Sequence, residues 1–333
     1  MDSLSNIVAN TLVPHAAFNE ASKRIEQCMK YAMGSSEPIC IAVIGQSRTG
    51  KSRVIEQFYR QHPSVRTKEG LRVPVLLVRT PAKPTVKGLV ELMLRAMGDP
   101  RFDIGTANAK TIRLKVLMKN AGTYMVIIEE FQHFYDKGLH AVMHEVADWL
   151  KILVDDTKCA LLVAGLPSCC TVLDQNEQLA GRFSAPIIMP RFKWESEKDR
   201  AEFRKILTSF QVSISQYFDI PKLDEDEMAF RCYCATGGLI GYLSNFLRQA
   251  VWNAIDSNSK VITLKDLRIA HKASVWVTER VGRQISPFSE KFQIASSDEH
   301  LLKAQEIGQA LPPVVVGRIR VTKAMKSREL ATL

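Results

Sequence analysis

The residues of this chain best suited to chemistry stand at positions 45–52, which read GQSRTGKS. This run fits the pattern G-x-x-x-x-G-K-[ST], in which a glycine-rich turn brings backbone N–H groups close to phosphate oxygens. Lys51 would reach the terminal phosphates of a nucleotide, and the Ser52 hydroxyl would contact Mg²⁺. The residues expected to surround the phosphates are Gly45, Gln46, Ser47, Arg48, Thr49, Gly50, Lys51 and Ser52.

The segments on either side of this motif have the composition that the motif requires. Residues 40–44, CIAVI, form a short apolar run typical of a buried parallel strand. Residues 53–61 place Val54, Ile55 and Phe58 on one face of an amphipathic helix. The amino end of such a helix carries a partial positive charge that favours phosphate. This strand–loop–helix context favours a nucleotide site, with ATP and Mg²⁺ as cofactors, over a chance match to the pattern.

Two adjacent carboxylates follow another apolar run, YMVII, at residues 124–128. An acidic residue at the end of a neighbouring strand holds Mg²⁺ through water in enzymes of this kind. Glu129 stands at the Mg²⁺ position, where Asp is more usual, and Glu130 stands where it would polarise the attacking water. The alternative is a solvated pair of carboxylates at a strand end.

Arg182 is the best candidate for a cation that neutralises charge on the transferred phosphoryl group. It lies after the fourth apolar strand segment and just before the fifth. An arginine of this kind is often supplied by a neighbouring subunit, so its presence predicts a homo-oligomer. The alternative is a surface arginine that pairs with a local carboxylate such as Glu177.

Strand and helix patterns alternate up to about residue 192 and then give way to helical patterns only. Apolar segments at 40–44, 72–80, 124–128, 159–164 and 185–189 are the expected strands of a parallel five-stranded sheet. This order predicts an α/β nucleotide-binding domain followed by a small all-helical domain. The predicted divisions are a helical segment at 1–36, the α/β core at 37–192, the helical domain at 193–280 and a basic tail at 281–333.

Composition narrows the class of protein. The chain has 333 residues, 46% of them hydrophobic, and its seven cysteines include no CxxC pair, so neither a disulfide framework nor a zinc site is indicated. No apolar run approaches the ~18 residues of a membrane span, and the first residues lack the features of a signal peptide. We therefore expect a cytoplasmic protein with no membrane partner. The net charge of +10 suggests a large anionic partner, with nucleic acid the first candidate.

Several of these segments together resemble the TniB/TnsC family of AAA+ ATPases that regulate DNA transposition. The matching runs are GQSRTGKS, VIIEE, VAGLPS, EQLAGRF and TGGLIGYLSNFLRQAVWNAI, within roughly residues 10–275. The resemblance implies a P-loop AAA+ core followed by a helical lid. It also implies an oligomer that assembles on duplex DNA as a ring or filament and hydrolyses ATP slowly, as a switch. Such a protein links a target-selection protein of the TniQ type to the transposase subunits.

Two positions depart from the pattern of the family, in addition to Glu129. Leu166 follows Gly165 where threonine is frequent, which leaves Ser168 as the candidate for a polar contact with the nucleotide. Many AAA+ lids begin with an arginine that touches the γ-phosphate, whereas Gly241 stands near that place here. The resemblance therefore implies a lid without this sensor and a slow hydrolysis.

Two groups of basic residues are candidates for contact with DNA. The resemblance puts a DNA-tracking surface in this part of the core, and counterion release makes each phosphate contact favourable and salt-sensitive. Lys110 and Arg113 are three residues apart on one helix and share a face, while Lys115 points elsewhere. The alternative for each is an ordinary solvated charge, and no base-reading motif is present, so we expect contact independent of sequence. The candidates are Lys83, Lys87, Lys110, Arg113 and Lys119.

Three functions remain open at this point. The first is an ATP-gated DNA-binding factor for transposition, and the second is another AAA+ machine such as a helicase loader. The third is a nucleotide-dependent scaffold with negligible hydrolysis.

The role of the basic tail, which includes VVVGRIRV, is also open. The alternatives are a second DNA contact, a peptide that docks on the transposase, and a disordered segment.

Overall fold

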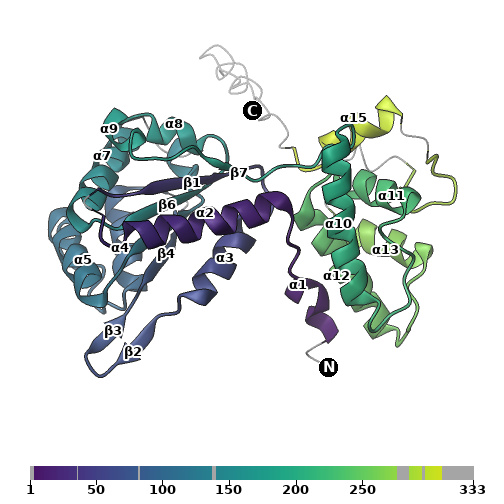
Figure 1. Ribbon diagram of the computed structural model, residues 1–333, viewed down its shortest axis with the longest axis horizontal. Helices are drawn as coiled ribbons and strands as arrows, with labels where there is room; N and C mark the ends of the chain where they lie inside the picture. The colour runs from purple at the N-terminus through teal and green to yellow at the C-terminus, as the bar shows by residue number, and fades with distance from the viewer. Residues whose placement is uncertain are drawn as a thin grey trace, which may run out of the picture.

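Five short apolar segments form one parallel sheet in the computed structural model, which describes residues 4–35, 37–81, 83–136, 140–275, 285–294 and 297–309 (Figure 1). The strands lie in the order β4-β5-β6-β1-β7. The chain runs from β1 to the far edge, returns through β5 and β6, and then adds β7 on the other side of β1. Ligands of open α/β sheets bind beyond the carboxyl ends of strands at such a switch point. The strands are β1 (Cys40–Ile44), β4 (Val75–Arg79), β5 (Met125–Glu129), β6 (Ala160–Gly165) and β7 (Ile187–Ile188).

Helices cover both faces of this sheet, and successive strand residues alternate between the two faces. Helices α2 (Ala16–Ala32) and α3 (Lys51–Gln61) pack on one face, against residues such as Val43 and Ile127. Helices α4 (Val86–Ala96), α5 (Ala107–Ala121) and α7 (His140–Thr157) pack on the other, against residues such as Ala42 and Ile128. A sheet covered on both sides needs strands that are apolar throughout, which is why these segments read as continuous runs.

Prolines set the limits of two strands that differ from the sequence prediction. The run at 72–80 was expected to be a single strand, but Pro74 interrupts it, and β4 begins at Val75. Proline has no backbone N–H to donate to a sheet. The residues before it form an exposed antiparallel hairpin of β2 (Val65–Thr67) and β3 (Gly70–Arg72), which the sequence did not predict. Pro186 and Pro190 likewise leave β7 with only two residues instead of the five expected.

The second lobe is helical and is called the lid below. It contains α10 (Glu197–Ile214), α11 (Asp226–Thr236), α12 (Ile240–Asp256), α13 (Leu264–Ser274) and α15 (Asp298–Glu306), around an aromatic-rich core that includes Phe203, Phe246 and Tyr233. Side chains cap the amino ends of several helices, and Thr263 with Asp266 forms a capping box on α13. The architecture expected from the sequence, a parallel five-stranded α/β core followed by a helical lid, is the observed one.

Both ends of the described chain pack on the lid. The 3₁₀ turn η1 (Leu4–Asn6) and helix α1 (Ile7–Asn10) contact α12, and the Trp252 indole N–H donates to the Ser5 carbonyl at 2.8 Å. Leu301 and Ile307, expected in a basic tail, are buried in the lid core, so this part of the segment 281–333 is folded. Residues 310–333, including VVVGRIRV, lie outside the described residues. Within the described ranges, every helix is too short or too polar to cross a membrane.

The remaining described helices are short. Two of them follow β5 and β6 at the carboxyl edge of the sheet, and the third ends shortly before Arg182. They are α6 (His133–Asp136), α8 (Cys169–Leu173) and α9 (Glu177–Ala180).

Candidate functional site

The phosphate loop wraps tightly at the carboxyl end of β1. Gly45 N–H donates to the Gly165 carbonyl at 3.2 Å, and the Thr49 hydroxyl donates to the Gln46 carbonyl at 2.9 Å. A Cβ at Gly45 would lie 2.5 Å from the Met189 carbonyl oxygen, so no larger residue fits there. Gly50 has a φ of 97°, the left-handed conformation that glycine adopts without strain, and α3 begins at the next residue. The loop therefore presents its N–H groups at the amino end of α3, as phosphate binding requires.

Lys51 folds back over this loop. Its ammonium group donates to the carbonyls of Gly45 and Gln46, at 2.7 Å each. Burial lowers the pKa of Lys51, and the nearby Glu130 carboxylate opposes that shift. The lysine thus lies at the mouth of the loop, close to an acidic group. Ser52, the second residue of α3, is exposed at the same end of the helix.

The two predicted carboxylates lie at the carboxyl end of β5, two strands from the phosphate loop. Glu129 ends the strand, is 9% exposed, and faces the Arg79 guanidinium of β4 at 3.5 Å. Glu130 follows it with a φ of 55°, an uncommon conformation for a residue with a side chain. Strained backbone of this kind clusters at functional sites. The local fold therefore holds the Glu130 carboxylate in a defined place beside Lys51.

Gln132 is a site residue that sequence reasoning missed. Its amide N–H₂ donates to the Glu130 carboxylate at 2.6 Å, and its amide oxygen accepts from the Leu166 N–H at 3.1 Å. It is 4% exposed, and a Cβ at Gly165 would lie 2.1 Å from its oxygen. Gln132 therefore connects Glu130 to the loop that follows β6. Its position two residues after the acidic pair was the available signal.

Ser168 and Thr80 lie at the same edge of the sheet. Ser168 is the residue immediately before α8, in the loop that leaves β6. Thr80 follows β4, its N–H donates to the Glu129 carbonyl at 2.9 Å, and its buried hydroxyl has no hydrogen-bond partner within the described chain. Thr80 was not predicted from the sequence. The carboxyl ends of β1, β4, β5 and β6 thus bring the predicted polar residues together at one edge.

The lid lies directly against the phosphate loop. Gly241, in the first turn of α12, donates its N–H to the Arg48 carbonyl at 2.8 Å. A cavity of about 390 Å³ lies between the loop and the lid and is lined by the loop residue Gln46, the linker residues Arg191 to Lys193, and Tyr233, Gln305 and Gln309 of the lid, among others. A larger cavity, of about 1090 Å³, lies within the lid and shares no lining residue with the phosphate loop. Of these two cavities, only the smaller is lined by a residue of the phosphate loop, Gln46, and its lining does not include Lys51, Glu129 or Glu130.

Arg182 lies at the opposite end of the sheet from the phosphate loop of its own chain. Its carbonyl accepts from the N–H of Cys40, the first residue of β1, at 3.2 Å. Its guanidinium pairs with Asp155 of α7 at 2.6 Å, so the local carboxylate is Asp155 and not Glu177. Arg182 therefore cannot reach the phosphates bound by its own protomer.

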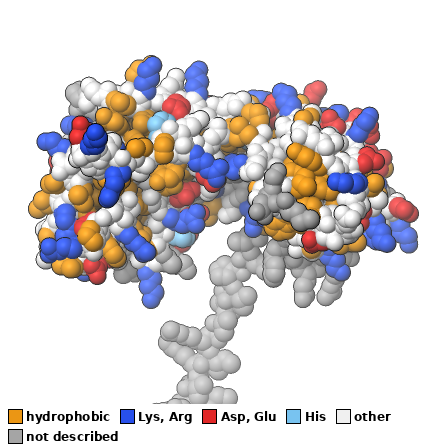
Figure 2. Space-filling view, turned by 90° about the horizontal axis from the view of Figure 1, so that it is seen from below, with side chains coloured by type: hydrophobic (Ala, Val, Ile, Leu, Met, Phe, Trp, Pro, Cys, Tyr) orange, Lys and Arg blue, Asp and Glu red, His pale blue; other side chains and the backbone are white. Residues whose placement is uncertain are grey.

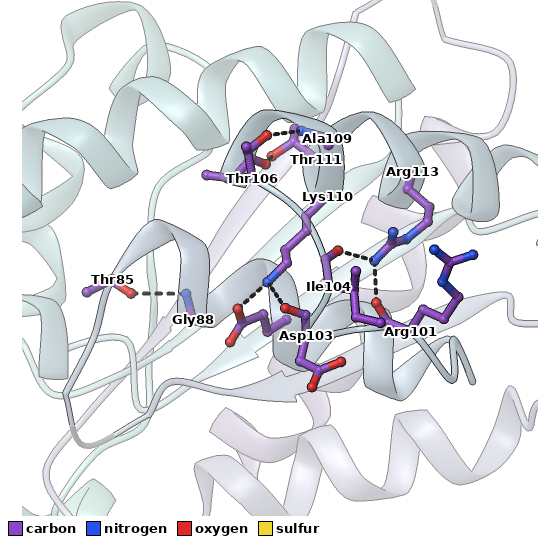
Figure 3. Close-up of polar contacts among 12 residues, drawn as sticks. Thr85, Gly88, Arg101, Asp103, Ile104, Thr106, Ala109, Lys110, Thr111 and Arg113 are labelled. Atoms are coloured by element: carbon purple, nitrogen blue, oxygen red, sulfur yellow. Dashed lines mark hydrogen bonds and ion pairs between the residues drawn. The ribbon is translucent and has the colours of Figure 1, made fainter.

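Lys110 is not a surface residue, which corrects the expectation that it contacts DNA. Its side chain is fully buried, and its ammonium group binds the Glu91 carboxylate and the Asp103 carbonyl, the latter at 2.7 Å (Figure 3). A fully buried ammonium group is expensive to separate from its carboxylate partner, even though the Glu91 side chain is partly exposed. Lys110 therefore fixes α5 to α4 and to the loop before α5.

Arg113 also makes contacts within its own chain, although its side chain is partly exposed, so its contact with DNA stays a prediction. Its Nη2 donates to the carbonyls of Arg101 and Ile104, at 2.6 and 3.2 Å (Figure 3). Its Nε lies 2.7 Å from the Asp99 carboxylate. Lys110 and Arg113 share a helix face as predicted, but that face is turned toward residues 99–104. Lys83, Lys87 and Lys119 are exposed.

Comparison with known proteins gives one family. The family model described as "Bacterial TniB protein" matches residues 4–195. No curated protein matches the chain significantly.

Among solved structures, Cdc6p from Pyrobaculum aerophilum matches with a TM-score of 0.61 and 11% identity, over 83% of this chain and 73% of that one. The ORC2 protein of Aeropyrum pernix, in ADPNP–ADP complexes, matches with a TM-score of 0.56 and 15% identity, over 84% and 74%. The ORC1 protein of Aeropyrum pernix, in complex with DNA, matches with a TM-score of 0.57 and 13% identity, over 81% and 69%. At such identities the likeness concerns the fold alone. Since the family match spans more than half of the 333 residues, the chain belongs to the TniB family, and its fold is that of the AAA+ ATPases.

Proposed function

We propose that this protein is an ATP-dependent, DNA-binding AAA+ regulator of transposition. It oligomerises on duplex DNA and links a target-selection protein to the transposase, and ATP hydrolysis drives disassembly. One observation carries the proposal: a phosphate loop, an acidic pair and a lid helix meet at one edge of the sheet in a TniB family chain. Steady-state ATPase measurements with and without duplex DNA test it, and DNA-stimulated phosphate release is the expected result.

ATP and Mg²⁺ fit the residues at this edge. The loop offers backbone N–H groups and Lys51 to the phosphates, and the buried hydroxyl of Thr80 and the Glu129 carboxylate offer oxygen ligands of the kind Mg²⁺ prefers. Ser52 and Glu129 would hold the ion, largely through water. When bound, Mg²⁺ neutralises charge on the β- and γ-phosphates. Glu130 would orient the attacking water, with Gln132 fixing its carboxylate, and Ser168 would contact the nucleotide.

The placement of Arg182 supports catalysis between subunits. Since it lies at the far end of its own sheet, the phosphates it neutralises must belong to a neighbouring protomer. Its present partner Asp155 would release it on assembly, at small cost because the pair is partly exposed. An oligomer, as a ring or filament, is thus part of the proposed catalytic unit.

Replacing Arg182 by alanine is expected to leave nucleotide affinity within about twofold and to lower ATP hydrolysis by about 10³-fold or more. The decisive measurement mixes this variant with Glu130→Gln. Each variant alone is inactive, but an interface that takes Arg182 from one and Glu130 from the other is intact. Recovery of about a quarter of wild-type activity in an equal mixture is expected from random assembly. A mixture as inactive as its components would mean that Arg182 is not the residue supplied in trans.

Lys83 and Lys87 are the strongest remaining candidates for DNA contact. Both are exposed at the carboxyl end of β4, and no ion pair within the described chain engages them. Lys119 is exposed in the last turn of α5, which leads to the amino end of β5, so it lies toward the other end of the sheet. Lys and Arg side chains are scattered over the face seen in Figure 2 and not gathered in one patch. We therefore propose a local phosphate contact through Lys83 and Lys87, with Lys119 as a separate site.

The double variant Lys83→Glu, Lys87→Glu is expected to weaken duplex binding by about tenfold or more, irrespective of sequence. Loss of two phosphate contacts also lowers the slope of log K against log salt by about 2. Titrations of labelled duplex at several salt concentrations measure both quantities. The double variant Lys265→Glu, Lys272→Glu, at two exposed lysines of the lid, is the control because it changes the net charge by the same amount. Equal losses in both variants would assign the effect to net charge alone.

A nucleotide-dependent scaffold with negligible hydrolysis is the second candidate. It is favoured by the contacts that engage both carboxylates: Glu129 faces Arg79, and Glu130 accepts from Gln132. ATP-dependent assembly on DNA without phosphate release would support this function over the first.

A further inference from the structure

The contact between the phosphate loop and the lid is made by backbone as well as side chains. The N–H of Gly241 donates to the Arg48 carbonyl at 2.8 Å. A Cβ at Gly241 would lie 2.7 Å from the Cβ and 3.0 Å from the Cα of Arg48, so the helix approaches the loop at a distance that only glycine permits. The absence of a side chain at Gly241 therefore lets α12 touch the loop.

Arg48 also contacts the lid through its side chain. Its guanidinium lies over the Tyr242 ring, 4.6 Å from the centroid. The ring is 8% exposed, and Gly308 of the segment after α15 packs closely on it, since a Cβ there would lie 3.1 Å from its Cε2. Tyr242 is thus fixed by the lid while its ring faces the loop. This cation–π pair therefore joins a side chain of the loop, Arg48, to a side chain of the lid, Tyr242.

The backbone of Arg48 requires this support. Its φ of 67° is the left-handed conformation, which a non-glycine residue keeps only when its surroundings hold it. Arg48 stands in the middle of the loop whose N–H groups must face the phosphates. The lid contacts hold that conformation from outside the loop.

We propose that Arg48, Gly241 and Tyr242 form a latch that couples the docked lid to the nucleotide-binding shape of the phosphate loop. The proposal rests on the nucleotide site proposed above and concerns its regulation. Docking of the lid pre-shapes the loop and raises nucleotide affinity, and by reciprocity a bound nucleotide holds the lid in place. A cation–π pair of this kind changes an equilibrium constant by about 2- to 30-fold.

Tyr242→Leu is the first test, because it removes the ring and leaves every predicted phosphate ligand in place. The dissociation constant of this variant for a fluorescent ATP analogue is expected to be about tenfold higher than that of the wild type. Tyr242→Phe keeps the ring and is expected to bind as the wild type does. Tyr217→Leu, which changes a tyrosine exposed on the lid, is the matched control and is expected to have no effect. Unchanged affinity in Tyr242→Leu overturns the proposal.

Two further measurements separate a latch from a loss of lid stability. In an Arg48→Ala background, Tyr242→Leu is expected to cause less than a twofold further loss of affinity, because its partner is already absent. Equal losses in both backgrounds overturn the latch. In the wild type, backbone hydrogen exchange of α12 is expected to slow when nucleotide binds. In Gly241→Ala, nucleotide is expected to leave the exchange rate of α12 unchanged. Slowing of equal size in both proteins also overturns it.

These outcomes are distinct from failure of the proposed function. If the wild-type chain does not bind the ATP analogue, the nucleotide site itself is wrong. If the wild type binds it and the latch variants bind it equally well, the nucleotide site stands and the latch alone is wrong.

Discussion

Lys51→Ala is expected to raise the dissociation constant for ATP by about 100-fold. The ammonium group folds over the phosphate loop and donates there to two carbonyls at 2.7 Å. A hydrogen bond to a charged group contributes about 1.5–3 kcal/mol, and about 2.7 kcal/mol corresponds to 100-fold. Titration with a fluorescent ATP analogue measures the change. Loss of nucleotide affinity is expected to remove ATP-dependent DNA binding as well.

The control for this prediction is Lys265→Ala, which removes a lysine exposed on the lid and distant in the chain from the loop. It is expected to bind nucleotide as the wild type does. Equal DNA affinity with and without ATP in the wild type would show that nucleotide does not gate DNA binding. Wild-type ATP affinity in Lys51→Ala would place the nucleotide elsewhere on the chain.

The nucleotide edge of the fold could be predicted because its signals are local. The phosphate loop has glycines at fixed positions, and β1 and β5 are apolar runs of the length that a buried strand requires. Parallel strands bring their carboxyl ends to one edge, so Lys51 and Glu130 meet without further information. The limits of the strands were predicted less accurately. The apolar run at 72–80 is continuous in the sequence, but Pro74 interrupts it and β4 begins at Val75.

The basic residues of α5 could not be placed from the sequence. Helical spacing correctly put Lys110 and Arg113 on one face, but spacing does not say what that face meets. The carboxylates of Glu91 and Asp99 lie on α4 and on the loop after it, and they turn the face inward. This tertiary pairing determines which basic side chains of α5 remain exposed.

The missed residues have the same explanation. Gln132 accepts a hydrogen bond from the N–H of Leu166, which lies 34 residues away in the chain. Leu301 packs in a lid core built mainly from residues 203–270. Gly241 was predicted only as a missing arginine. The structure gives it a positive role, since its lack of a side chain allows α12 to touch Arg48.

In the functions proposed above, the two sets of contacts at this edge act on different steps, nucleotide binding and ATP hydrolysis. Arg48 meets the lid through Gly241 and Tyr242, which concerns how the loop is shaped for binding. Gln132 meets Glu130, which concerns where the carboxylate stands during hydrolysis. A substitution at Glu130 should therefore separate hydrolysis from binding.

Glu130→Gln is expected to lower ATP hydrolysis by about 10²–10⁴-fold while nucleotide affinity stays within about twofold. The amide cannot take a proton from water, but its oxygen can still accept the Gln132 N–H that now fixes the carboxylate at 2.6 Å. The site thus keeps its shape and loses its base. Phosphate release and nucleotide titration, measured on the same preparation, separate the two effects.

This variant also tests whether hydrolysis drives disassembly. With ATP bound but not cleaved, its complexes with duplex DNA are expected to persist after dilution, whereas those of the wild type decay as phosphate is released. Glu56→Gln, on the exposed side of α3, is the matched control and is expected to behave as the wild type does. Equal lifetimes of the Glu130→Gln and wild-type complexes would contradict the switch. If the wild type releases no phosphate at all, the protein is a scaffold, because assembly then depends on nucleotide binding alone.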